Sequence, residues 1–363
     1  MKTISIIGGG IAGLTVANIL HKEDMKFALY ERSSLQSNKG HGFIIPSEGL
    51  EILKTYVNST DLLNDGNILN EYISFDYKGN FIDKKQLQND FIISRKALVD
   101  LLEKNIPREF IYHDKSVSYI QKSTDGILEV FFSDDTSIVP TSIVIAADGS
   151  KSKIRTTLIS DKLLRETGVH EIVNIFENSE LATILGNQFL KFHHTDGGLS
   201  IGLLKVSATE VLCYAQFDIN RYPLKEDSTI EINNFMQTNF KDWAYPVSLF
   251  LEKTNFENAH YWRVNELDIL DDYFSENTVF VGDTAHSLLP FTSQGVTSAI
   301  KDAQVLIDSL KRNPSDYKKA FKEYSTVRKE EIAIHFKNGR LLRDNFLLPL
   351  EEQKNNIIPI SFK

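Results

Sequence analysis

The stretch Ile4-Ser-Ile-Ile-Gly-Gly-Gly-Ile-Ala-Gly-Leu14 decides the fold. Its first four residues form a short, mostly apolar run that is typical of a strand buried in a parallel sheet. The glycines between positions 8 and 13 predict a tight turn, and apolar residues then recur at helical spacing from Leu14 to Leu20. The run Lys26-Phe-Ala-Leu-Tyr30 predicts the next strand. The chain therefore opens with a strand–helix–strand unit, which indicates an α/β fold.

The spacing Gly8-x-Gly10-x-x-Gly13 within this turn predicts a dinucleotide-binding site. Gly8 allows the tight turn, Gly10 lets the backbone approach a pyrophosphate, and Gly13 lets the helix pack on the strand. The helix start offers free N–H donors and a partial positive charge to the phosphates. Glu31 follows Gly13 by 18 residues, where a carboxylate can accept from a ribose hydroxyl and would repel a 2′-phosphate. The expected nucleotide is therefore FAD or NAD rather than NADP.

Composition and charge limit the partners of the chain. It has 363 residues, with 40 Lys and Arg against 49 Asp and Glu, so its net charge is −9, which argues against nucleic acid as a partner. No apolar run reaches the roughly 18–20 residues of a membrane helix, and the glycines interrupting the N-terminus argue against a signal peptide. The single cysteine, Cys213, excludes a disulfide within the chain and fits a reducing compartment. We expect a cytoplasmic protein; the sequence carries no signal for its oligomeric state.

The order of patterns along the chain predicts an inserted domain. The predicted parts are a discontinuous, Rossmann-like nucleotide-binding domain at 1–165 and 275–312, a substrate-binding domain at 166–274, and a C-terminal helix and tail at 313–363. The inserted part carries glycine-punctuated strand patterns, which favour a mainly antiparallel β-sheet and give the whole chain an α/β class with an α+β insertion. Part of 70–95 can join this sheet. The last amphipathic helix is expected over Tyr317–Asn345.

A second motif follows a later strand. The run Asn277-Thr-Val-Phe-Val281 predicts a buried strand that ends in Gly282-Asp283, and Pro290 and Ser293-Gln294-Gly295 follow at the start of a helix. A carboxylate at such a strand end can bind a polyol chain, which FAD has and NAD lacks, and the helix start can direct N–H groups at an electron-rich ring. A turn cap is the alternative role of Asp283. His286 has no Ser or Cys partner in the pattern, so we expect it to pack as a supporting residue.

Two further segments can contact the same ligand. Asp148-Gly149-Ser150-x-Ser152-x-x-Arg155 also follows an apolar run, and there Asp148 can steady the pyrophosphate region while Arg155 supplies positive charge or an ion pair. A purely structural turn is the alternative. Ser94 is a predicted N-cap, which places Arg95 at a helix start where its guanidinium can reach a phosphate.

Together these motifs resemble the single-component (class A) FAD-dependent aromatic monooxygenases of the para-hydroxybenzoate hydroxylase type. Within that family the sequence is most similar to the kynurenine monooxygenase and tetracycline-inactivating monooxygenase branches, and the resemblance extends to about residue 345. The residues that it implies at the cofactor are Gly8, Gly10, Ala12, Gly13, Glu31, Arg32, Arg95, Asp148, Asp283, Pro290, Gly295 and Val296.

Four features depart from the family pattern. Ser293 stands where the family's Gly-Gln-Gly begins, Thr297 where Asn is common, and Lys301 where an acid is common. The segment Gly40–Ile45 lacks the arginine that often lies close to the flavin in this family. Ser293 is therefore expected to add a side chain near the flavin ring.

The resemblance implies a monooxygenase that uses NADH or NADPH and O2 to hydroxylate a small aromatic or polycyclic substrate. It implies that NAD(P)H reduces non-covalently bound FAD, that O2 adds to give a flavin C4a-hydroperoxide, and that the distal oxygen passes to the substrate. The protein then has to position the substrate and exclude water. No catalytic acid–base residue and no metal are expected.

Candidate substrate-binding residues are His193 and Tyr214, provided that strand alternation turns their side chains into the pocket. Packing within the sheet is the alternative for both. Two other functions stay open: a related FAD-dependent reductase, which would not incorporate O2 into its product, and a non-catalytic flavin- or substrate-binding protein. A disulfide reductase is excluded, since it needs paired redox cysteines.

Overall fold

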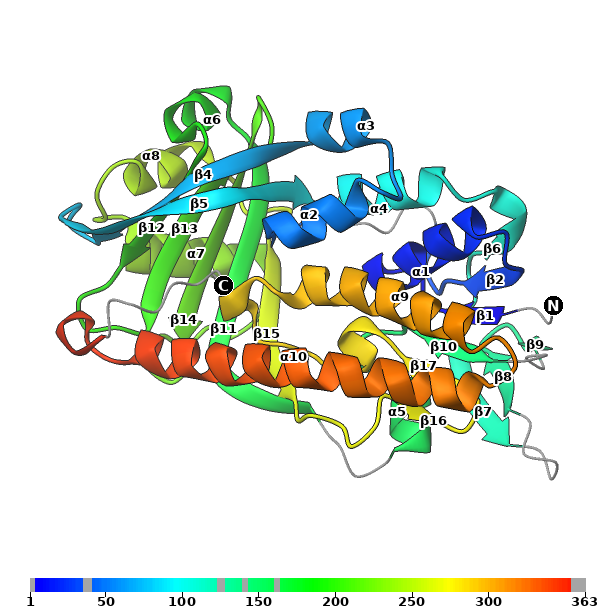
Figure 1. The fold of residues 1–363 in the computed structure, drawn as a ribbon. Coiled ribbons are helices and arrows are strands. Elements are labelled where there is room, and N and C mark those ends of the chain that lie inside the picture. Colours follow the sequence, from blue (N-terminus) through cyan, green and yellow to red (C-terminus); the bar gives the residue numbers. More distant parts are fainter. Residues whose placement is uncertain (1–3, 35–40, 123–127, 139–142, 160–163, 354–363) are drawn as a thin grey trace.

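The computed structural model describes residues 4–34, 41–122, 128–138, 143–159 and 164–353, and its elements form two large parts (Figure 1). One part surrounds a six-stranded sheet, and the other is built on an eight-stranded sheet. Gly40 of the predicted loop and the predicted tail from 354 to 363 lie outside the described residues. The mixed α/β architecture predicted from the sequence is confirmed.

The six-stranded sheet carries the predicted strand–helix–strand unit. Five of its strands run parallel in the order β17-β10-β1-β2-β6, and β16 pairs antiparallel with β17. All four residues of β1 are buried, as expected of a parallel sheet that is covered on both faces. The strands are β1 (Ile4–Ile7), β2 (Phe27–Tyr30), β6 (Ile111–Tyr112), β10 (Val144–Ala146), β16 (Phe274–Ser275) and β17 (Thr278–Phe280).

The eight-stranded sheet has the order β15-β11-β14-β13-β12-β4-β5-β3. Its neighbouring strands pair antiparallel except for β12 and β4, which are parallel. The strands are β3 (Gly42–Ile45), β4 (Gly66–Asp76), β5 (Phe81–Ser94), β11 (Leu164–Glu177), β12 (Gln188–His193), β13 (Leu199–Lys205), β14 (Glu210–Asp218) and β15 (His260–Leu267). The sheet thus draws three strands from the segment before residue 95 and five from 164 onward.

A small third sheet, β7 (Val117–Lys122), β8 (Leu128–Phe132) and β9 (Ser137–Ile138), packs against the core of the first part. The α-helices are α1 (Ile11–Lys22), α2 (Ser47–Leu53), α3 (Ser59–Asn64), α4 (Arg95–Lys104), α5 (Lys153–Leu158), α6 (Ser179–Leu185), α7 (Thr229–Phe240), α8 (Val247–Lys253), α9 (Gly295–Arg312) and α10 (Tyr317–Leu347). The predicted N-cap Ser94 is confirmed, because its hydroxyl accepts from the Ala97 N–H at 3.1 Å. None of the helices in the described residues is long and apolar enough to cross a membrane.

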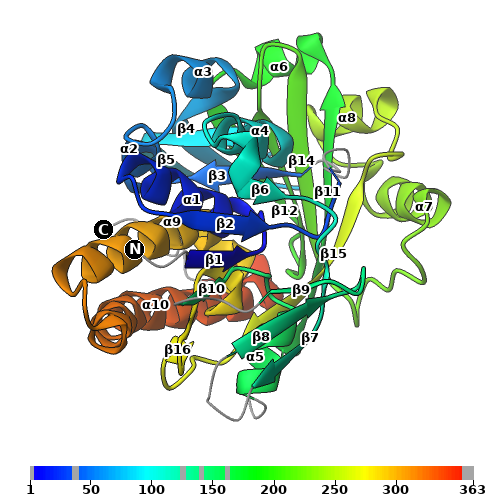
Figure 2. The same cartoon turned by 90° about the vertical axis from the view of Figure 1, so that its right-hand side faces the viewer.

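The two faces of the eight-stranded sheet have different surroundings. Its outer face packs against α6, α7 and α8 through a continuous apolar cluster, and Figure 2 shows α7 and α8 on that side. The inner face carries Tyr214 and its neighbours and borders the cavity next to the parallel sheet. Helix α10 runs past both parts of the molecule (Figure 1). The site is therefore enclosed by elements far apart in the sequence.

Candidate functional site

One large cavity lies between the parallel sheet and the inner face of the eight-stranded sheet. Its volume is about 1190 Å³, above the roughly 300–1000 Å³ usual for a small-molecule site. One region is lined by Gly8, Gly10, Ala12, Glu31 and their neighbours, where the parallel strands end. Another region is lined by side chains from β11, β12 and β14. The cavity is thus large enough for an extended cofactor and a second ligand.

The three glycines of the first turn have different physical roles. Gly8 has φ +108°, and a Cβ atom there would lie 2.3 Å from the carbonyl oxygen of Ala147. A Cβ atom on Gly13 would lie 1.9 Å from the carbonyl oxygen of Gly8. In contrast, a Cβ atom on Gly10 would meet no described atom within 4 Å. Packing thus accounts for Gly8 and Gly13, whereas Gly10 leaves the backbone open toward the cavity, as a bound pyrophosphate requires.

Glu31 lies at the cavity wall directly after β2, and backbone donors hold its carboxylate in place. The N–H of Gly9 donates to Oε2 at 2.6 Å and the N–H of Ser33 donates to Oε1 at 2.8 Å. Arg32 also lines the cavity. Because two backbone N–H groups orient it, the carboxylate is pre-organised to accept further hydrogen bonds from a ribose.

The turn Gly282–Thr284 places Asp283 at the cavity wall. Gly282 has φ +59°, and a Cβ atom there would lie 2.8 Å from the Cβ of Ala12, so the turn packs closely on the start of α1. The side chain of Asp283 is accessible from the cavity, which it lines. Desolvation by the protein around this cavity wall raises the pKa of Asp283, and the nearby charge of Asp302 adds to this rise. A ligand that donates hydrogen bonds would therefore stabilise this carboxylate.

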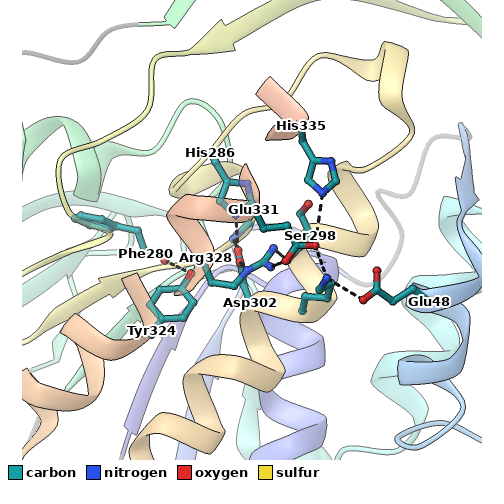
Figure 3. A network of polar contacts seen from close by, with 11 residues as sticks. Glu48, Phe280, His286, Ser298, Asp302, Tyr324, Arg328, Glu331 and His335 are labelled. Carbon is teal, nitrogen blue, oxygen red and sulfur yellow. Dashed lines mark hydrogen bonds and ion pairs between the residues drawn. The ribbon is translucent and has the colours of Figure 1, made fainter. Parts of the chain in front are cut away.

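Asp302 on α9 fixes this turn, and Figure 3 shows it between His286 and Arg328. Its Oδ2 accepts from the backbone N–H of Gly282 at 2.7 Å and contacts Nε2 of His286 at 2.6 Å. Its Oδ1 accepts from Nε of Arg328 at 2.7 Å, and neither charged side chain is exposed to solvent. His286 is 3% exposed and holds Asp302 rather than lining the cavity, as expected of a supporting residue.

Asp148 and Arg155 have separate places at the end of β10. Asp148 lines the cavity and accepts from the Ser152 hydroxyl at 2.6 Å, and burial raises its pKa. Arg155 is 1% exposed and donates to the carbonyl oxygens of Ser150 at 2.6 Å and Thr284 at 3.0 Å. Arg155 therefore connects the end of β10 to the Asp283 turn. This is a structural role, which was the alternative to direct contact with a ligand.

Comparison with known proteins agrees with this geometry. Residues 1–329 match the protein family described as FAD binding domain. The chain belongs to this family. It is an FAD-dependent monooxygenase, an oxidoreductase that uses O2 and NAD(P)H, of the group that hydroxylates aromatic compounds.

Similar proteins cover the chain almost completely. 3-Amino-4-hydroxybenzoate 2-monooxygenase PtmB3 from Streptomyces platensis is 25% identical over 95% of this chain and 89% of its own. 6-Hydroxynicotinate 3-monooxygenase from Pseudomonas fluorescens is 22% identical over 96% of this chain and 92% of its own. HpxO from Klebsiella pneumoniae, solved with FAD and uric acid, has a TM-score of 0.85 at 21% identity, covering 95% of this chain and 88% of its own. Tetracycline destructase Tet(51) has a TM-score of 0.75 at 21% identity, covering 96% of this chain and 92% of its own.

The departures from the family pattern have local explanations. Ser293 has φ +53°, a left-handed conformation that glycine adopts without strain, which is a physical reason for the usual glycine at this position. Thr297 packs against α2, where a Cβ atom on Gly49 would lie 2.6 Å from its hydroxyl. Lys301 lies between two carboxylates, and it donates to Glu48 at 2.9 Å and to Glu331.

The segment without an arginine, Gly42–Ile45, forms β3, and Arg95 lies near it. The backbone N–H of Arg95 donates to the carbonyl oxygen of His41 at 2.6 Å, and both residues line the cavity. The rings of His41 and His260 stack at 5.2 Å. Burial lowers the pKa of His41 to about 4, helped by His260 and by the charge of Arg95. Arg95 thus brings positive charge to the wall where the family arginine is missing.

The remaining predicted residues do not all reach the cavity. Pro290, Gly295, Val296 and Tyr214 line the cavity. Within the described residues His193 is not part of the lining, and burial lowers its pKa to about 3. The prediction missed a set of lining side chains that lie on strands, among them Glu171, Lys191, Gln216, His260 and Trp262. Strand periodicity of 2 was the available signal, since it turns Lys191 to the same face as Phe189, but it does not say which face borders a cavity.

Proposed function

We propose that FAD lies along the cavity, with its ADP half at Gly8–Ala12 and Glu31 and its ring beside Pro290–Val296. The remaining space would take a small aromatic or polycyclic substrate for hydroxylation. The observation that carries this proposal is that one cavity joins the open Gly10 turn to the polar inner face of the sheet.

The chain's own residues would bind and orient the cofactor. Free N–H groups at the start of α1 would face the pyrophosphate, Glu31 would accept from the adenosine ribose, and Asp283 would accept from the polyol chain. When bound, FAD supplies the redox chemistry that activates O2. Tyr214 and the surrounding wall would position the substrate and keep water away from the reacting atoms.

The replacement Asp283→Ala tests the cofactor site. We expect the purified variant to lose most of its FAD, measured as flavin absorbance per polypeptide and as the Kd for added FAD. Asp308→Ala is the matched control, because Asp308 is an exposed residue of α9 and should leave FAD binding unchanged. An Asp283→Ala protein that is fully flavinated and active would refute the assignment.

A ligand screen tests the reaction. Hydroxylated aromatic acids and hydroxypyridines are the first candidates, because relatives are named for 3-amino-4-hydroxybenzoate and 6-hydroxynicotinate. Hits would be scored by stimulated NAD(P)H consumption, with hydrogen peroxide release measured alongside. Label from ¹⁸O2 in the product supports hydroxylation of that compound. Product without label, or no stimulated consumption with any of these compounds, contradicts the proposed substrate class.

Two further assignments, of domains and of cellular location, accompany this proposal. We propose the domain division at 1–165 with 275–312, 166–274 and 313–363, with β4 and β5 counted in the substrate sheet. We propose a cytoplasmic location, supported by the buried, free thiol of Cys213. Membership of the kynurenine monooxygenase branch stays a prediction.

A further inference from the structure

The inner face of the eight-stranded sheet carries three buried polar side chains that the proposed FAD site does not use. They are Glu171 on β11, Lys191 on β12 and Gln216 on β14, here called the sheet-face cluster. All three line the cavity, and they are 4%, 4% and 3% exposed. Two opposite charges therefore lie in the wall of the region proposed for the substrate.

Gln216 joins the two charged groups. Lys191 Nζ donates to Gln216 Oε1 at 2.8 Å, and Gln216 Nε2 donates to Glu171 Oε1 at 2.6 Å. Glu171 lies directly opposite Gln216 in the β11–β14 register. The amide is thus oriented by both partners, with its oxygen toward the ammonium and its nitrogen toward the carboxylate, and it holds a donor and an acceptor side by side.

The sheet makes room for this arrangement at Gly202. Gly202 pairs with Lys191 on one side and with Tyr214 on the other, and a Cβ atom there would lie 2.2 Å from Cε1 of Tyr214. The ammonium of Lys191 crosses this gap toward β14 and lies 5.3 Å from the centroid of the Tyr214 ring. The missing side chain at Gly202 therefore brings a cation and an aromatic wall together.

The cluster has bonding capacity to spare. An ammonium has three N–H donors and a carboxylate has about four acceptor positions. Within the described residues, the side chains of Lys191 and Glu171 each make one hydrogen bond. Burial raises the pKa of Glu171 to about 7 and lowers that of Lys191 to about 8, so both charged forms lack part of the solvation that they would have in water. A ligand with one acceptor and one donor would supply it.

We propose that Lys191 and Glu171 select a ring that carries an acceptor oxygen beside an N–H donor, the pattern of a cyclic amide (lactam). Lys191 donates to the ring oxygen, Glu171 accepts from the ring N–H, and Tyr214 packs against the ring. This inference rests on the proposed function only in that the substrate occupies this region of the cavity. It names two specificity-determining residues and the chemical class that they recognise.

The test uses the FAD-loaded enzyme and two matched probe pairs. The probes are 2-pyridone with N-methyl-2-pyridone, and their bicyclic homologues 2-quinolone with N-methyl-2-quinolone. Each methylated compound keeps the acceptor oxygen and lacks the donor. Calorimetric titration without NAD(P)H should give at least tenfold tighter binding of the unmethylated member of at least one pair. Equal affinities within both pairs, or no binding of any probe, would overturn the proposal.

Three variants assign the preference to the two side chains. Lys191→Met should weaken lactam binding at least tenfold, and Glu171→Met should bring the two members of a pair to within about twofold. The double variant Lys191→Met/Glu171→Met removes both charges together and so avoids leaving one buried and unpaired; it should also show no preference. Lys205→Met, at the end of β13 and outside the cavity lining, is the matched control. A Glu171 variant that keeps the tenfold preference, or a Lys191 variant that binds both members of a pair as tightly as the wild type, would contradict the assignment.

A purely structural cluster would give a different result, since its loss would lower thermal stability and leave the ratio of affinities within a probe pair unchanged. Flavin content and NAD(P)H consumption of the same preparation separate the two proposals. A protein that holds FAD and shows no lactam preference removes this inference and leaves the proposed function standing. A protein that prefers lactams but shows no stimulated NAD(P)H consumption with any ligand does the reverse.

Discussion

Replacing Asp302 by alanine should strongly destabilise the half of the molecule that carries Asp283. Asp302 and Arg328 are both fully buried, and the lost carboxylate also accepts from the Gly282 N–H and contacts His286. Removing one partner of a buried ion pair leaves the other charge uncompensated and costs about 3–5 kcal/mol. Urea unfolding of the FAD-free protein, followed by fluorescence, should show a loss of this size in the free energy of unfolding.

Two comparisons separate the buried charge from the general effect of mutation. The double variant Asp302→Leu/Arg328→Met should recover most of the lost stability, because apolar residues often replace a buried pair at little cost. Glu331→Gln should cost no more than about 1 kcal/mol, since Glu331 is 29% exposed and solvent screens its contact with Arg328. An Asp302→Ala protein within 1 kcal/mol of the wild type, or a double variant no better than the single one, would refute the reasoning.

The pH dependence of this difference has a defined sign. Burial alone would raise the pKa of Asp302, but the charges of His286 and Arg328 outweigh it, so the pKa lies below its ordinary value. Such a group stabilises the fold above its unfolded-state pKa of about 3.9, and the contribution is lost as pH falls through the lowered folded-state pKa. The gap between wild type and Asp302→Ala should therefore stay constant from about pH 5 upward and narrow below about pH 4.

Three smaller changes test single positions. Gly10→Ala should leave the stability of the FAD-free protein within about 0.5 kcal/mol of the wild type and weaken FAD binding at least tenfold by titration, because its Cβ points into open space. Gly13→Ala should instead cost about 3 kcal/mol in urea unfolding, because its Cβ would lie 1.9 Å from the carbonyl oxygen of Gly8. Ser293→Gly should raise the melting temperature by relieving a left-handed conformation worth up to about 1 kcal/mol.

Local signals predicted the nucleotide-binding half well. Strand β1 and helix α1 follow from apolar periodicity and glycine spacing. Helix α9 begins at Gly295, where the motif Ser293-Gln294-Gly295 predicts a helix start. The sequence left open that part of 70–95 joins the far sheet, which holds β4 and β5. The membership of β3 was not predictable in this way, because strand pairing depends on contacts between segments far apart in sequence.

The same limit applied to the polar residues of the site. Glycines 8, 10 and 13 can be recognised from their spacing. Each is required either by a closely packed backbone neighbour or by a ligand beside the turn. In the sequence, Lys191 and Glu171 look like ordinary solvent-facing residues of alternating strands. Alternation assigns each side chain to one face of the sheet but does not say whether solvent or a cavity borders that face. The sequence predicted that Arg155 supplies positive charge or an ion pair, because its hydrogen-bond partners are not visible in the pattern. Only the fold brings the Thr284 carbonyl to its guanidinium.

Helix α10 accounts for how two separately built regions can act on one substrate. In its first half Arg328 holds Asp302 and, through it, the turn of Asp283. Near its end Arg340 forms a two-point contact with Glu266 of β15, and the carbonyl oxygen of Phe346 accepts from the Gly198 N–H at 2.7 Å. A single helix therefore fixes the parallel sheet and the eight-stranded sheet at once. Hydroxylation needs the oxidising group and the substrate carbon at a fixed separation. These contacts would hold the two regions at that separation, while α10 contributes no side chain to the described cavity lining.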